Sequence, residues 1–294
     1  MDSIYQEIRG YYGGPEVTPP EYAPQYTIHV YFDGPMCVCQ VIYEKMLDEV
    51  LNLFPIGVTP VVETIMTDFE KAAINAFEKK FSDAQVAGCY FHLGQCAWRR
   101  IQREEANYKR YKEDPAFAIR VRRFLALAFV PPNEVHRYMN LLMADEVARN
   151  DGLVEFATYF QKTYVGQQFH NDDEVSEIPG TYNYPIWNMF DRVRQNKPRT
   201  NNSLEGWHGA FARGIRLHPS VVDLAKKYRQ EQDKRIGDRI LHIQGRINGS
   251  HRTKAKYQQV TKRLKEFTVR LESNILVDLM YLEQVAIAMK VTTE

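Results

Sequence analysis

The chain contains few cysteines and no long uncharged apolar segment. Its 294 residues include four cysteines, and these do not form the disulfide framework of a secreted protein. No segment approaches the roughly 18 apolar residues of a membrane-spanning helix, and the first residues lack the pattern of a secretory signal. We therefore expect a protein of a reducing, intracellular compartment that does not enter a membrane.

The sequence also lacks an overall excess of either charge, although its two ends each have one. The net charge is +1, with 44% apolar and 26% charged residues, which is ordinary for a globular domain. Residues 1–96 carry 5 Lys/Arg against 13 Asp/Glu, a balance of −8, whereas residues 221–270 carry 14 against 5, a balance of +9. The chain is therefore electrically polarised.

The basic C-terminal region has a composition that suits phosphate backbones. Its cations are accompanied by Tyr228, Tyr257 and Phe267, as in many surfaces that bind nucleic acid. A solvated helix face has the same composition, so both interpretations stay open. The candidate nucleic-acid contacts are Lys226, Lys227, Arg229, Lys234, Arg235 and Arg239.

Asp68 stands where strand-forming residues give way to helical spacing. β-branched residues precede it from position 61, and apolar residues follow at positions 69, 72, 73, 76 and 77. The pattern predicts a strand that ends beside Asp68 and then an amphipathic helix. An acid at the carboxyl end of a strand lies at the rim of an open α/β sheet, where ligands bind. An Asp in this place is also a common helix cap, which is the alternative interpretation.

Other segments of the N-terminal part alternate in the same way. Residues 26–32 predict a strand, and Asp33-Gly34 predicts a hairpin turn into a short strand near residues 36–39. Residues 41–54 predict a helix, with Ile42, Met46, Val50 and Leu53 on one face. A second apolar run, residues 85–92, predicts a strand that opens into a helix at Leu93.

From about residue 93 to residue 197 the sequence is dominated by helical spacing. The segment 115–129 is strongly apolar, begins with a proline and is followed by Pro131 and Pro132, and the pattern continues at Val135, Tyr138, Met139 and Leu142. The periodicity fails between residues 167 and 184, which predicts a loop there.

A third informative block follows this helical region. Asn201, Asn202 and Ser203 form a cluster of cap residues, and apolar residues follow them at helical spacing. The pattern predicts a helix with Glu205 in or near its first turn. His208 would lie on the same face, close to one turn further on.

The blocks around Asp68, Cys89–His92 and Glu205–His208 occur in an order that resembles the transposase domain of Mutator-like elements, the MULE family. The resemblance includes residues 25–29 and 218–220, so it covers most of the chain. It implies an α/β fold, a ribonuclease-H-like core with a large all-helical insertion and a helical C-terminal tail. The implied divisions are a core at 1–92, an insertion at 93–198, a helix with the third acid at 199–217 and a basic helical tail at 218–294.

The resemblance also implies a chemistry. In the family, three acids hold two Mg²⁺ or Mn²⁺ ions that promote cleavage and transfer of DNA strands, because carboxylates are hard oxygen ligands. Asp68 matches the second acid and Glu205 the third, as catalytic and metal-binding residues. The implied partner is DNA, the implied compartment is the nucleus, and the resemblance allows a homo-oligomer of the kind that joins transposon ends.

The chain departs from the family at the first acid. Where the family has an Asp-Gly pair, the sequence in register has Tyr12 and Gly13. Glu16 needs a shift of register, and Asp33 follows the wrong strand. The segment between the hairpin and the helix near Val41 is also short. We therefore predict a truncated or impaired enzyme, with two alternatives: a domesticated, non-catalytic nucleic-acid-binding regulator, or an inert remnant of a transposable element.

Cys89 and His92 also raise the question of zinc. One pair supplies two of the four ligands of a structural site, and Cys37 and Cys39 are the obvious second pair. We favour a buried cysteine and a satisfied core histidine, and do not expect zinc. His208 could orient Glu205 or approach a phosphate, or it could be a core or cap residue. No Cys/His array provides the DNA-recognition module that such transposases often carry.

Overall fold

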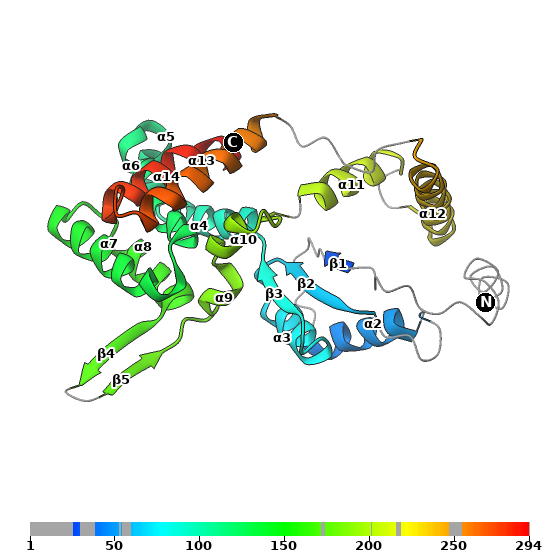
Figure 1. Ribbon diagram of the computed structural model, residues 1–294, viewed down its shortest axis with the longest axis horizontal. Coiled ribbons are helices and arrows are strands. Elements are labelled where there is room, and N and C mark those ends of the chain that lie inside the picture. Colours follow the sequence, from blue (N-terminus) through cyan, green and yellow to red (C-terminus); the bar gives the residue numbers. More distant parts are fainter. Residues whose placement is uncertain are drawn as a thin grey trace. The chain divides into compact units, whose positions relative to one another are not determined.

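The computed structural model describes residues 26–29, 39–52, 54, 60–171, 174–200, 202–215, 219–246 and 255–293. These residues are mostly helical, with a few short strands (Figure 1). The chain divides into two compact units. One comprises Met1–Ile28, Pro35–Ile65 and Lys71–Val86, and the other comprises His29–Gly34, Met66–Glu70 and Ala87–Glu294. The coarse prediction of an α/β fold with large helical parts agrees with this architecture.

A three-stranded sheet contains the strand that leads to Asp68. The strands β1 (Tyr26–His29), β2 (Val62–Thr67) and β3 (Gln85–Gly88) lie in the order β1-β2-β3. All residues of β2 except Glu63 are buried, as its β-branched composition predicts. The Cys89 N–H donates to the Thr67 carbonyl at 2.7 Å, so the carboxyl ends of β2 and β3 meet. The predicted strand before Asp68 is confirmed.

The helices α2 (Gln40–Asn52) and α3 (Lys71–Lys80) pack against each other, and both were predicted. The predicted apolar face of α2 is wrong, however, because Ile42 is 56% exposed and the buried residues are Tyr43 and Leu47. The reason is the partner helix. α2 packs on it through Tyr43 and Leu47, and in this rotation the C-terminal lysines of α3 pair with acids of α2, Lys79 with Glu44 at 2.7 Å and Lys80 with Asp48.

The prediction of a strand that reaches His92 is also wrong. β3 ends at Gly88, and α4 (Tyr90–Gln102) begins two residues later, after Cys89 in an extended conformation. A Cβ on Gly88 would lie 2.7 Å from the ring of Phe69, so only glycine fits where the strand stops. The apolar run continues because Tyr90, Leu93 and Ala97 have helical spacing and enter the core of the bundle.

The second unit is built around a helical bundle. α5 (Glu105–Glu113), α6 (Pro115–Ala126), α7 (Val135–Arg149) and α8 (Val154–Phe160) share one core with α4. Asp114 caps α6 by accepting from the N–H groups of Ala116 and Phe117 at 2.9 and 3.2 Å, and Pro115 occupies its first turn. The predicted helix at 115–129 is confirmed, with its last residues, Leu127–Phe129, in a 3₁₀ turn.

The segment predicted as a loop contains a β-hairpin, which also corrects the expectation of an all-helical insertion. After a 3₁₀ turn at Pro132–Glu134 and a π-helical turn at Gln161–Val165 come β4 (Gln167–Asn171) and β5 (Glu174–Ile178), which are antiparallel. Gly166, at φ 86°, lets the chain turn into β4, since a Cβ there would collide with the Ile178 carbonyl. His136 of α7 contacts Glu177 at 3.3 Å and ties β5 to the bundle.

The C-terminal helices α13 (Ala255–Glu272) and α14 (Asp278–Thr293) belong to the same core. Val260, Leu264, Tyr281 and Leu282 join it, and the Tyr281 hydroxyl donates to the Phe129 carbonyl at 2.5 Å. The short helices α9 (Tyr184–Trp187) and α10 (Phe190–Arg194) complete the core. The predicted basic helical tail is therefore partly a structural element of the bundle.

Two further helices, α11 (Asn202–Arg213) and α12 (Val221–Ile243), contact each other through side chains. The rings of Phe211 and Tyr228 lie 5.0 Å apart, and the Lys227 Nζ lies 5.6 Å from the Phe211 ring centroid. Ser220 caps α12 by accepting from the Asp223 N–H at 3.1 Å. Within the described ranges, no helix has both the length and the apolar character needed to cross a membrane.

Candidate functional site

Asp68 directly follows β2 and is partly exposed. Its Oδ1 accepts a hydrogen bond from the Thr67 hydroxyl at 3.4 Å. Because α3 begins at Lys71, the residue next to its first turn is Glu70 and not Asp68. This boundary fits a carboxylate at the rim of the sheet better than the alternative of a simple helix cap.

The backbone after Asp68 is held by aromatic side chains from the helical region. The Tyr182 hydroxyl donates to the Phe69 carbonyl at 2.6 Å. The ring of Phe69 makes edge contacts with Tyr164 and Tyr182, at centroid distances of 5.8 and 5.2 Å, and those two tyrosines stack on each other. Residues more than ninety positions away in sequence thus fix the turn that presents Asp68.

The charge of Asp68 acts on two partly buried groups, the Cys96 thiol and the Tyr182 phenol, that are neutral at pH 7. Burial raises the pKa of the Cys96 thiol, a hydrogen bond with Tyr164 lowers it, and the Asp68 carboxylate raises it further. Burial likewise raises the pKa of Tyr182 to about 12, and the charges of Asp68 and Glu70 add to that rise. The surroundings of Asp68 therefore include a thiol and a phenol that do not compensate its negative charge.

Cys89 and His92 lie together at the start of α4. Cys89 is the residue before the helix, His92 is in its first turn, and both side chains are buried. The hydrogen bond from the Cys89 N–H to the Thr67 carbonyl places this turn beside the residue that precedes Asp68. The prediction that both side chains are buried is confirmed, but the histidine is not fully satisfied, because its buried Nδ1 atom has no hydrogen-bond partner among the described residues. Among the described residues, no group of three or more His, Cys, Asp or Glu side chains is placed to hold a metal ion.

The helix predicted to carry Glu205 is confirmed, because α11 begins at Asn202 and Glu205 lies in its first turn. The structure describes the backbone of Glu205 and His208 but not their side chains, so neither is related to Asp68 by a distance. The candidates for the first acid, Tyr12, Glu16 and Asp33, lie outside the described residues. The strand predicted near residues 36–39 does so too, except for Cys39, which is exposed and not in a strand.

The cations of α12 fall into two kinds. Lys226, Arg229, Lys234 and Arg235 are exposed. Lys227 is less exposed, pairs with Glu231 at 3.3 Å and covers the Phe211 ring, so it contributes to the contact between α11 and α12. The side chain of Arg239 is outside the described set. The four exposed cations are accessible to a polyanion such as a nucleic acid, which is what the charge pattern predicts.

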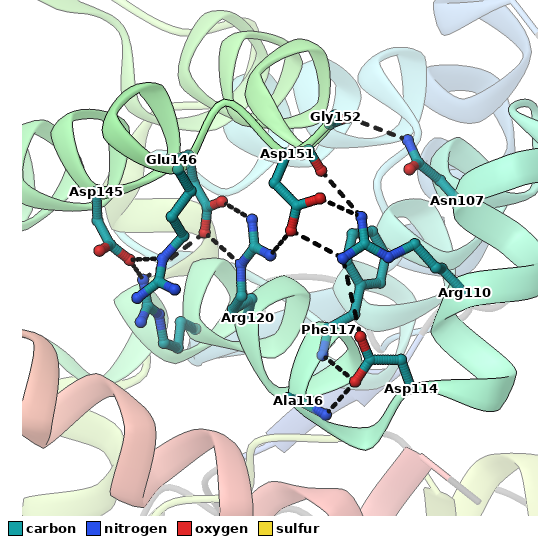
Figure 2. Close-up of polar contacts among 12 residues, drawn as sticks. Asn107, Arg110, Asp114, Ala116, Phe117, Arg120, Asp145, Glu146, Asp151 and Gly152 are labelled. Carbon is teal, nitrogen blue, oxygen red and sulfur yellow. Dashed lines mark hydrogen bonds and ion pairs between the residues drawn. The ribbon is translucent and has the colours of Figure 1, made fainter.

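Sequence analysis missed a network of arginines and acids in the bundle (Figure 2). Arg110 binds Asp151 through two nitrogens at 2.6 and 2.8 Å, and Arg120 bridges Asp151, at 2.6 Å, and the fully buried Glu146. Arg123 pairs with Asp145. The network joins α5, α6 and α7. Its ion pairs give Arg110, Arg120 and Arg123 a structural role within the bundle. No local pattern could reveal it, because the paired residues lie 22 to 41 positions apart.

Comparisons of the chain with models of protein families, with curated proteins and with solved structures find no match. The functional argument therefore rests on the chain's own residues and their geometry.

Proposed function

We propose that this chain is a transposase-domain protein of the Mutator-like type, with a ribonuclease-H-like core and an ancestral activity of metal-dependent DNA strand cleavage and transfer. The observation that carries the proposal is the position of Asp68. It follows β2 at the edge where β3 also ends, and a hydrogen bond of 2.7 Å joins Thr67 to Cys89 at the start of α4. The sequence blocks that resemble the family thus include two that meet at one edge of a sheet.

The residues near this edge suit a divalent cation. Asp68 offers a hard oxygen donor and is partly exposed, so an ion can reach it. Asp68 and Glu205 would hold Mg²⁺ or Mn²⁺, which when bound activates water or a DNA 3′-hydroxyl for attack on a phosphodiester. The chain's own contribution is placement: Tyr182 and Tyr164 hold Phe69, and Phe69 fixes the turn next to the carboxylate.

The second candidate is a non-catalytic nucleic-acid-binding protein derived from such a transposase. It is favoured by Tyr12 in the place of the first acid, since a tyrosine is a poor ligand for Mg²⁺. The exposed cations of α12 serve either candidate. In either candidate function the protein binds DNA in the nucleus, and it could do so as a homo-oligomer. An inert remnant of a transposable element would lack selected binding as well as cleavage.

The test is a DNA cleavage assay in Mg²⁺ or Mn²⁺ with the full chain, Asp68→Ala and Glu205→Ala. Asp83→Ala is the matched control, because Asp83 is an exposed acid in the turn before β3. Cleavage that is lost in the first two variants and kept in the control supports the enzyme. Absence of cleavage by the unmodified chain rejects it, and the second candidate is then judged by DNA affinity.

A further inference from the structure

The helix α2 carries apolar side chains on two faces, and one of these faces packs on α3. Tyr43 and Leu47 are its buried residues, on the side where α2 and α3 lie together (Figure 1). On the other face, Ile42 and Val50 are 56% and 41% exposed, and Met46 between them is partly exposed. These three residues are four positions apart, so they form one row along the helix. We call Ile42, Met46 and Val50 the α2 ridge.

The α2 ridge lies away from the contact with α3. Glu44 and Asp48, which pair with Lys79 and Lys80 of α3, are on the opposite side of α2 from Met46, because successive residues of a helix are rotated by about 100°. Single exposed apolar side chains are common on protein surfaces. A row of three over two turns is instead the pattern of a helix that packs against another helix. The α2 ridge therefore has the pattern of a contact surface.

Two opposite charges lie along one side of the α2 ridge. Lys45 and Glu49 are both exposed, are about one helical turn apart and lie on the same side of Met46. Among the described residues, the ion pairs of α2 are formed by Glu44 and Asp48, and Lys45 and Glu49 take no part in them. The ridge is thus bordered by one positive and one negative charge that are available to a partner.

A second copy of α2 matches this arrangement. In an antiparallel pair related by a twofold axis, one side of the helix meets the same side of its copy with the order of residues reversed. With the axis level with residue 47, Lys45 of one copy lies opposite the partner's Glu49, and the reverse pair forms by symmetry. The apolar rows then interleave, with Ile42 near the partner's Val50. A parallel pair would instead place like charges at the same level, and a wholly basic or wholly acidic partner would match only one of the two charges.

We propose that two copies of this chain associate through the α2 ridge, antiparallel about a twofold axis, with Lys45 and Glu49 forming two ion pairs across the contact. The apolar row provides the attraction because it leaves water, and the charges select the orientation. Because α2 has 13 residues, the contact is small, and we expect weak association with a Kd on the order of 10 to 100 µM. The proposal requires neither DNA nor a metal ion, so it is independent of the proposed function.

The experiment is sedimentation velocity of the full chain over a range of concentrations, without DNA. We expect an equilibrium between monomer and dimer. Ile42→Ser/Val50→Ser should raise its Kd at least about tenfold, because the apolar row loses its two exposed members. Val61→Ser is the matched control, because Val61 is 55% exposed and is not part of the ridge; it should leave the Kd unchanged. The substituted side chains are exposed, so each variant should keep its fold, which circular dichroism verifies.

Reversing the two charges tests the antiparallel orientation. Lys45→Glu and Glu49→Lys should each weaken the dimer at least about fivefold, since symmetry turns two attractive pairs into two repulsive ones. The double variant Lys45→Glu/Glu49→Lys should restore the Kd of the unmodified chain, and an equimolar mixture of the two single variants should form a heterodimer. Glu78→Lys, at an exposed acid of α3, is the control for the reversal of charge and should not weaken the dimer.

The proposal is overturned in either of two ways. A chain that stays monomeric well above the expected Kd would mean that the α2 ridge is covered by another part of the chain or by a different protein. A dimer that responds equally to the ridge variants and to their controls, or whose single charge variants do not associate on mixing, would have its contact elsewhere or in another orientation.

Discussion

The Tyr182 hydroxyl donates a hydrogen bond of 2.6 Å to the carbonyl of Phe69, the residue that follows Asp68. The two residues are 113 positions apart. One comes from the long helical region and the other from the turn at the end of β2. The helical region therefore takes part in shaping the turn that presents the candidate catalytic acid, in addition to forming its own core.

Tyr182→Phe should loosen this turn without emptying the space that the ring fills. We expect a loss of about 1 kcal/mol in the free energy of unfolding, because the partly buried Phe69 carbonyl loses its donor. If the chain cleaves DNA, the variant should also need more Mg²⁺ for half-maximal cleavage. Urea denaturation and a Mg²⁺ titration measure the two effects. Tyr184→Phe, at a similarly exposed tyrosine, is the control, and equal changes in both variants would contradict a role for the Phe69 contact.

The buried ion pair between Arg120 and Glu146 makes a second prediction. Glu146 is fully buried and contacts both Arg120 and Arg123, so Glu146→Gln removes the buried one of the two carboxylates that each arginine contacts and leaves only Asp151 and Asp145. We expect a loss of about 3 kcal/mol or more in the free energy of unfolding. Glu155→Gln is the control, because Glu155 is exposed and lies 4.0 Å from Arg100, and it should cost less than about 1 kcal/mol. The midpoint of urea unfolding distinguishes them.

The acids of the same network predict how stability depends on pH. Hydrogen bonds from Arg110 and Arg120 hold the pKa of Asp151 below its ordinary value. The folded state therefore keeps Asp151 ionised where the unfolded chain takes up a proton. This stabilisation is complete above the ordinary Asp pKa of about 4 and is lost as pH falls towards the lower, folded value. Between pH 5 and pH 3, the Tm of the unmodified chain should decrease more than the Tm of Asp151→Asn. Equal decreases would contradict the prediction.

The sequence predicted those helices and strands that are determined by neighbouring residues. β-branched residues gave β2, helical spacing gave α3, and a proline next to a capping Asp marked the start of α6. Asp68 was located at the rim of the sheet for the same reason. Contacts distant in sequence were not predictable in this way. One example is the close approach of Gly88 at the end of β3 to the Phe69 ring.

The larger discrepancies have the same physical origin. α13 and α14 enter the core through contacts such as Tyr281 with Phe129, 152 positions apart, and the basic composition of α13 gave no sign of this. Hairpin β4–β5 has only five residues in each strand, so its alternation was too short to distinguish from a loop.

The exposed cations of α12 make the last prediction. Lys226→Gln/Arg229→Gln removes two charges from an exposed part of the helix and leaves Lys227, which contacts Phe211, in place. Because each lost phosphate contact reduces the release of counterions, DNA affinity should fall and the slope of log Kd against log salt should decrease by about 2. Lys109→Gln/Lys112→Gln removes the same net charge from exposed positions of α5 and should leave the slope unchanged. Fluorescence anisotropy over a series of salt concentrations measures both. If the slope changed equally in the two double variants, DNA binding would depend on the overall charge of the protein and not on the cations of α12.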